Sequence, residues 1–98
     1  MITGTTPKHT FGLPIDTGDI DKLKIIYYQN GKIVLEKYKE DCILEGKEVT
    51  CRLTQEDTLK FNEDDVKIRI RVKTTGGDAI ASKKHTVFCE DLLDEEVL

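Results

Sequence analysis

Apolar and basic residues alternate strictly over eight positions, from residue 66 to residue 73. Successive side chains of a β-strand point to opposite faces, so this alternation predicts a strand with one buried face and one face in water. The apolar positions are Val66, Ile68, Ile70 and Val72. The basic positions between and after them are Lys67, Arg69, Arg71 and Lys73. A chain with such a segment is expected to fold around a sheet.

A β-hairpin is predicted around Asn30-Gly31, which lies between two runs rich in β-branched and aromatic residues, 23–29 and 33–38. Asn-Gly is the strongest short-range hairpin signal, because both central residues of a type I′ turn need positive φ. A two-residue loop sets the expected cross-strand pairs, which are Tyr28 with Ile33, Ile26 with Leu35, Tyr27 with Val34 and Leu23 with Tyr38.

A second hairpin is predicted from residues 42–44 and 49–53, joined around Gly46-Lys47. This loop places Leu44 opposite Val49 and Cys42 opposite Cys51, the latter at a non-hydrogen-bonded position where side chains approach most closely. We expect the two cysteines to pack as a small apolar pair in the core, with a cross-strand disulfide formed on oxidation as the alternative.

Three further elements complete the predicted architecture. A first strand over residues 9–13 ends at Pro14, and the sequence TQED at 54–57 is typical of a capped helical turn that carries Leu59 and Phe61 into the core. A last strand over 79–88 follows the turn at Gly76-Gly77, and its register is open between Ile80 and Ala81 as the partner of Val72.

About seven short strands with turn signals every 8–12 residues predict an all-β, immunoglobulin-like antiparallel β-sandwich. The sequence lacks the Cys…Trp…Cys pattern of antibody domains, since it has no Trp. We expect one sandwich domain over residues 1–89 and an acidic tail over residues 90–98. A chain of 98 residues has one thin core and no room for an interior active-site cavity.

Charge and cysteine content predict the environment. The net charge of −4 gives no overall attraction to nucleic acid or anionic lipid, and no apolar run approaches the ~18 residues that span a bilayer. The polar beginning of the sequence does not resemble a secretory signal, and three cysteines without a CxxC motif do not make a disulfide framework. An intracellular protein with reduced thiols and no membrane partner is expected.

No catalytic, metal or cofactor site is predicted. A metal site needs three or four ligands, usually closely spaced, and the two histidines, His9 and His85, are far apart. Cys89 lies four residues after His85, which in a strand only places both on one face. A small metal-binding protein built on His85 and Cys89 remains an alternative. The many carboxylates fall in turns and in the tail, as expected of a solvated surface.

Two features are candidates for partner binding. Lys67, Arg69, Arg71 and Lys73 should project from one sheet face at about 7 Å intervals, as a wet surface, a docking face for an acidic partner or a contact for nucleic acid. No aromatic residues interleave with them for base stacking, so nucleic acid is the weaker reading. Leu92 and Leu93 lie in the acidic tail, which is either a frayed end or an arm that docks on a neighbouring subunit.

The order of several motifs resembles a known group of proteins. A D-T-G turn at 16–18 leads to LKIIY at 23–27 and Asn-Gly, followed by LTQEDT at 53–58, the basic strand, Gly-Gly-Asp at 76–78, Ser82 and the acidic Leu/Val tail. This order resembles small phage and prophage proteins of Gram-positive bacteria and the N-terminal β-sandwich domain of siphophage baseplate upper proteins. The resemblance implies a structural role in a virion or tail tip.

Together these observations predict a non-enzymatic phage or prophage structural or assembly protein that acts through protein–protein contacts. Its expected partners are other phage structural proteins or copies of itself, as a monomer or weak homodimer. Its expected location is the cytoplasm of the bacterial host or the virion. A nucleic-acid-binding module that uses the basic strand is the second alternative, beside the metal-binding protein.

Overall fold

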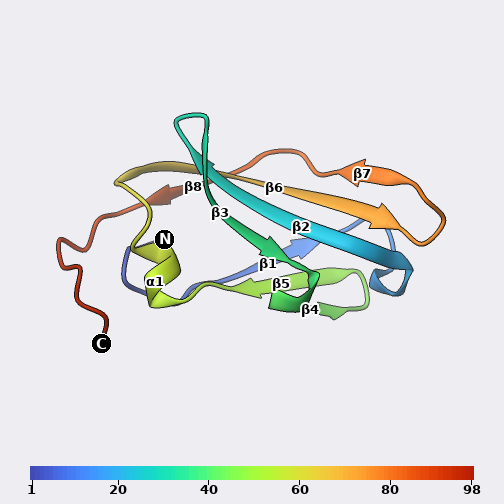
Figure 1. Ribbon diagram of the computed structural model, residues 1–98, viewed down its shortest axis with the longest axis horizontal. Helices are drawn as coiled ribbons and strands as arrows, with labels where there is room; N and C mark the ends of the chain where they lie inside the picture. Colours follow the sequence, from blue (N-terminus) through green and yellow to red (C-terminus); the bar gives the residue numbers. More distant parts are fainter.

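A computed structural model describes residues 1–98 as two antiparallel sheets. The smaller sheet has the order β1-β5-β4, and the larger has the order β3-β2-β6-β7, with β8 also pairing with β6 (Figure 1). The strands are β1 (Lys8–Gly12), β2 (Ile20–Gln29), β3 (Lys32–Tyr38), β4 (Cys42–Glu45), β5 (Glu48–Arg52), β6 (Asp64–Thr74), β7 (Ala79–Ala81) and β8 (His85–Cys89). Three short helical turns connect them, η1 (Thr17–Asp19), η2 (Lys39–Asp41) and α1 (Gln55–Thr58).

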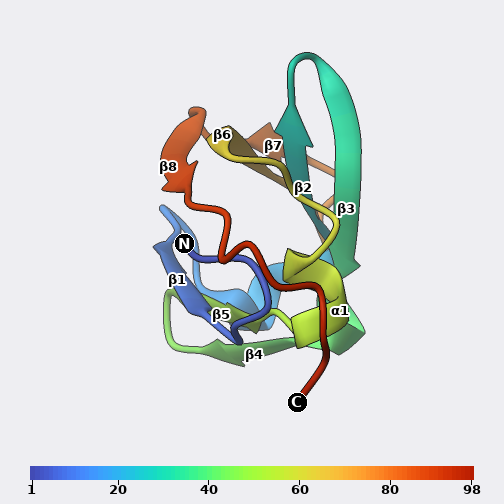
Figure 2. The same ribbon diagram turned by 90° about the vertical axis from the view of Figure 1, so that its left-hand side faces the viewer.

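The two sheets form two layers, seen end-on in Figure 2, with the core between their inner faces. Tyr27, Ile25, Ile68 and Ile70 of the larger sheet are buried against residues of the smaller one, such as Val49. The complete core is Phe11, Ile20, Leu23, Ile25, Tyr27, Leu35, Val49, Cys51, Leu53, Phe61, Val66, Ile68, Ile70, Val72 and Cys89. None of the helices has the length and apolar character needed to cross a membrane.

The strand order is that of an immunoglobulin-like sandwich. Strands β1, β5 and β4 take the places of B, E and D, and β3, β2, β6 and β7 with β8 take those of C′, C, F and G. All three cysteines are free, so no disulfide joins the sheets. The predicted all-β, immunoglobulin-like antiparallel sandwich is confirmed.

The Asn-Gly turn is confirmed, but the register of its hairpin is only partly as predicted. Asn30 and Gly31 have φ values of 51° and 74°, as a type I′ turn needs, and Tyr28 pairs with Ile33. A β-bulge then shifts the register, so that Tyr27 faces Leu35. The other three predicted pairs are wrong, because Val34 faces no residue of β2, and Ile26 and Lys24 face Glu36 and Tyr38.

This bulge has a clear physical reason. Without it, the two-residue turn would put Leu35 on the outer face beside Ile33, since a one-residue slip exchanges the faces of a strand. The extra residue in β3 returns Leu35 to the core, where only 7% of it is exposed. Burial of one leucine therefore decides the register that the turn alone would have set differently.

The other hairpins agree more closely with the sequence. Leu44 pairs with Val49 and Cys42 with Cys51, as predicted. Val72 pairs with Ile80, which resolves the open register. The continuous last strand is wrong, because β7 ends at Ala81 and β8 begins at His85. Ser82 explains the break, since its hydroxyl accepts a hydrogen bond from the backbone N–H of Ile70 (2.9 Å) in place of a backbone carbonyl.

The predicted capped turn is confirmed at α1. The hydroxyl of Thr54 accepts from the N–H of Asp57 (3.1 Å), and the Asp57 carboxylate accepts from the N–H of Thr54 (2.9 Å). Phe61 is buried after this turn and Leu59 is half-buried. The ammonium of Lys37, on β3, lies 2.7 Å from the Asp57 carboxylate and ties α1 to the larger sheet.

Candidate binding groove

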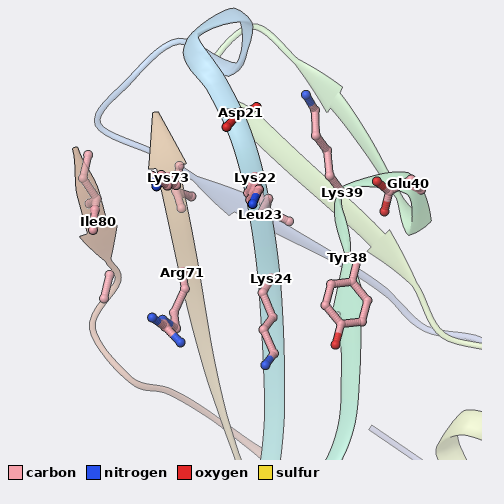
Figure 3. A pocket seen from close by; sticks show the side chains of 13 residues that line it. Asp21, Lys22, Leu23, Lys24, Tyr38, Lys39, Glu40, Arg71, Lys73 and Ile80 are labelled. Atoms are coloured by element: carbon pink, nitrogen blue, oxygen red, sulfur yellow. The ribbon is translucent and has the colours of Figure 1, made fainter. Parts of the chain in front are cut away.

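An open groove of about 630 Å³ lies on the outer face of the larger sheet, at the end where β2, β6 and β7 meet (Figure 3). Residues from β2, the end of β3, η2, β6 and β7 line it. Five of the lining residues are cations, and we call this surface the basic groove. They are Lys22, Lys24, Lys39, Arg71 and Lys73.

The cations meet because two strands alternate in the same way and lie side by side. Leu23 on β2 and Val72 on β6 point inward to the core, so their neighbours along each strand point outward. The pairing of β2 with β6 then sets Lys22 directly opposite Lys73 and Lys24 directly opposite Arg71. Two pairs of like charges therefore face each other, an arrangement that destabilises a sheet.

The protein neutralises this charge only in part. The ammonium of Lys24 lies 3.4 Å from the Glu36 carboxylate and 5.9 Å from the centre of the Tyr38 ring. Hydrogen bonding from the Tyr38 hydroxyl, followed by the Lys24 ammonium, lowers the pKa of Glu36. Lys39 donates to the carbonyl of Ile20 (2.9 Å). Two carboxylates, those of Asp21 and Glu40, stand at the rim.

The remaining three cations, Lys22, Arg71 and Lys73, make no side-chain hydrogen bond or ion pair within the chain. Figure 3 shows Arg71 and Lys24 side by side on adjacent strands, with the Arg71 guanidinium toward β7 and the Lys24 ammonium along β2. Lys22, Arg71 and Lys73 can donate to an anionic ligand without first breaking an internal contact.

Apolar surface lies on both banks of the basic groove. Tyr38, with 47% of its surface exposed, stands at the β3 side, and β7 contributes Ala79, Ile80 and Ala81 at the other side. The lining thus offers positive charge, one phenol and short apolar side chains. A ligand that fits it carries negative charge between apolar groups.

The structure divides the predicted basic stripe into two parts. Arg71 and Lys73 lie in the basic groove. Lys67 and Arg69 lie further along the same face of β6, and Lys67 donates to the Thr86 hydroxyl (3.1 Å). The Nε atom of Arg69 is buried without a hydrogen-bond partner.

Lys22, Lys24 and Lys39 were not predicted as site residues. The local pattern KLK at 22–24 is a signal for two outward cations, but nothing in it indicates that β6 is the neighbouring strand. The pairing of β2 with β6 joins residues some 45 positions apart, and it is this pairing that doubles the charge.

The C-terminal segment, residues 90–98, which contains Leu92 and Leu93, lies at the opposite end of the molecule from β7 of the basic groove (Figure 1). The N–H of Leu92 donates to the Thr3 hydroxyl (2.9 Å), and Leu93 is 88% exposed. Residues 90–98 pass the N-terminal segment and run beside α1 (Figure 2). The structure therefore does not bring the two groups of predicted binding residues together within one chain.

The histidines and cysteines lie elsewhere. His9 shares a 2.9 Å hydrogen bond with the Tyr27 hydroxyl, and burial lowers the pKa of His9 and raises that of Tyr27. His85 is exposed whereas Cys89 is buried. No three His, Cys, Asp or Glu side chains are grouped as a metal site requires, so the alternative based on His85 and Cys89 has no third ligand.

Comparisons with known proteins add little to this description. No family model matches the sequence, and no curated protein matches it. Among solved structures, the V domain of amphioxus IgVJ-C2 is similar to 91% of this chain, over 96% of its own, with 13% identity and a TM-score of 0.37. The immunoglobulin-like assignment therefore rests on strand order and register, not on this similarity.

Proposed function

We propose that the protein is a non-enzymatic interaction module that binds an acidic segment of a protein partner in the basic groove. We further propose that it serves as a structural or assembly component of a phage or prophage, made in the bacterial cytoplasm. The first part is supported by the geometry of the groove, and the second by the order of motifs along the sequence.

The observation that carries the binding proposal is the pair of opposed like charges, Lys22 with Lys73 and Lys24 with Arg71. Cross-strand pairs are the unit of sheet stabilisation, and opposite charges at these positions would favour the fold. A sequence that instead concentrates positive charge at one place, and compensates it only in part, breaks a local rule, and such exceptions are expected at functional sites. A bound anionic segment would supply the missing counter-charge.

A protein segment suits the basic groove better than nucleic acid does. The cations lie beside apolar surface on both banks, which a peptide with mixed acidic and aliphatic side chains can cover. Single-stranded nucleic acid would need several aromatic faces for stacking, and the groove presents one, Tyr38. The net charge of −4 also opposes approach to a long polyanion.

The proposed phage role is supported by the motif order described above and by the exposed strand edges. β3 and β7 end the larger sheet along the path β3-β2-β6-β7, and open edges are templates for contact with another subunit. Adjacent genes for capsid or tail subunits are the expected genomic setting. A position inside a metabolic operon would contradict this role.

The binding proposal is tested by an NMR titration of the protein with polyglutamate and, separately, with duplex DNA at low salt. Polyglutamate should shift the amide signals of groove residues on β2, β6 and β7, and the shifts should fade as salt rises. The double variant Arg71→Glu/Lys73→Glu should lose the response. The matched control Lys83→Glu/Lys84→Glu, which changes the same charge outside the groove, should keep it. Tighter binding of DNA, or no response to either polymer, would overturn the proposal.

A further inference from the structure

We propose that the acidic segment of the partner is residues 90–98 of a second copy of this chain, so that copies join tail to groove. This inference rests on the proposed function and names its partner. The composition of the segment, its few contacts with its own domain, and the distance between segment and groove support it.

Residues 90–98 combine negative charge with exposed aliphatic surface. Five of the nine residues are acidic, and the other four are aliphatic. Those four are exposed to extents of 51%, 88%, 46% and 95%, for Leu92, Leu93, Val97 and Leu98 in turn. Aliphatic side chains left in water beside carboxylates fit a surface that offers cations between apolar banks, as the basic groove does.

The far part of the segment is only lightly attached to its own domain. Glu90 forms a bridge with Ile2, and Leu92 donates to Thr3, so the segment is anchored up to that point. Beyond Leu92, two hydrogen bonds hold the segment to earlier residues, from the N–H of Leu93 to the Asp91 carboxylate (2.8 Å) and from the N–H of Leu98 to the side chain of Gln55 (2.7 Å). Leu93 has φ = 63°, a conformation that residues with a side chain rarely adopt. Release of residues 93–98 therefore breaks few contacts.

The spacing within the segment matches the width of the groove. Leu93 and Val97 flank three consecutive acids, and four residues of extended chain span about 13 Å. One bank is Tyr38 on β3, and the other is β7. The strands β2 and β6 lie between them, so the banks are three strand spacings apart, or about 14 Å. Side chains of an extended segment alternate between two faces, so Leu93, Glu95 and Val97 share one face. Laid across the strands, that face can place Glu95 over the cations and one aliphatic side chain on each bank, with Asp94 and Glu96 on the solvent side.

The segment cannot occupy the groove of its own chain in this way. Cys89 pairs with Asp64 at one end of β6, and Lys73 lies nine residues further along that strand, about 30 Å away. Arg71 lies seven residues along the strand, about 23 Å away, and the three acids at 94–96 follow Cys89 by five to seven residues, which reach about 16–23 Å when extended. Glu96 alone could then meet Arg71, with no length left for the segment to cross the strands from one bank to the other. Figure 1 shows β7 and the C-terminus at opposite ends of the molecule. The occupant must therefore come from another copy.

A contact of this kind is heterologous, since two different surfaces of the same chain meet. It leaves a free groove at one end of each pair and a free segment at the other, so further copies can add. Association should therefore increase with concentration without stopping at a dimer, and it should weaken with salt because opposite charges bring the copies together.

The test is sedimentation analysis of full-length protein at low salt. The groove variant Arg71→Glu/Lys73→Glu and the segment variant Glu95→Gln/Glu96→Gln should each associate at least about tenfold more weakly than the wild type, and the altered groove and altered segment have no opposite charges through which to bind each other. An equimolar mixture of the two variants should form a 1:1 complex and nothing larger, because only one intact groove and one intact segment remain per pair. The control Lys83→Glu/Lys84→Glu should behave as the wild type.

Two results would overturn the inference. One is wild-type protein that stays monomeric up to about 1 mM, a concentration at which even millimolar contacts form. The other is a mixture of the two variants that remains monomeric while circular dichroism shows both to be folded. If polyglutamate still shifts the groove signals in either case, the proposed function stands and only the identity of the partner is wrong.

Discussion

Replacement of Lys73 by glutamate should make the protein more stable. Lys73 faces Lys22 directly across β2 and β6, with its neighbour Arg71 on the same outward face. For exposed side chains with the dielectric constant of water, ~80, two like unit charges about 7 Å apart repel by about 0.6 kcal/mol. Reversal of one charge turns that repulsion into a similar attraction, so Lys73→Glu should add about 1 kcal/mol to the free energy of unfolding.

Urea denaturation of Lys73→Glu and wild type, followed by far-UV circular dichroism, measures this difference. In a thermal melt of the same 98-residue proteins, a gain of 1 kcal/mol in the free energy of unfolding corresponds to an increase in Tm of about 4–8 °C. At 1 M salt the screening length falls to about 3 Å, and most of the gain should vanish. Lys83→Glu makes the same change of charge outside any strand and should change stability little at either salt concentration. A variant that is destabilised at low salt, or no more stabilised than Lys83→Glu, would refute the argument.

Three further outcomes are expected from other parts of the fold. Unfolded, non-reduced protein should titrate three thiols, and oxidised glutathione should join Cys42 to Cys51, which leaves one; a single thiol before oxidation would contradict the packed pair. Lys37→Met should lose about 1–3 kcal/mol at neutral pH because Asp57 is left largely buried and unpaired. Burial raises the pKa of Asp57, but hydrogen bonding and attraction from Lys37 outweigh burial and lower it. The ion pair therefore stabilises the fold only while Asp57 is ionised, and melting curves should show the stability difference between Lys37→Met and wild type fading as pH falls below about 4. Gly31→Ala should lose about 1 kcal/mol in urea melts, since Gly31 has φ = 74° and only backbone strain opposes the methyl group.

Local patterns predicted the elements whose geometry depends on neighbouring residues. The turn at Asn30-Gly31 requires positive φ at both positions, and few residues other than these tolerate it. The loop at Gly46 likewise fixes every pair of its short hairpin, including Cys42 with Cys51. In both cases the information lies within a few positions of the turn, which is why the sequence alone was sufficient.

Local patterns failed where a distant contact makes the decision. The bulge in β3 is set by burial of Leu35 in a core that includes residues from both sheets, and the residues of the turn do not indicate that a bulge follows. The break between β7 and β8 depends on Ser82 reaching the backbone of Ile70, twelve positions earlier. The basic groove is the same kind of case, because its charge is doubled only when β2 and β6 become neighbours.

The contrast between the two faces of the larger sheet bears on where function lies. On the inner side, buried polar groups are paired: the Gln29 amide donates to the carbonyl of Asn62 (2.8 Å) and accepts from its N–H (2.9 Å), and the Tyr27 hydroxyl is bonded to His9. On the outer side, Lys22, Arg71 and Lys73 of the basic groove have no counter-charge within the chain. Stabilising Lys73→Glu should for that reason weaken binding, because the strain it relieves is the charge that a partner uses.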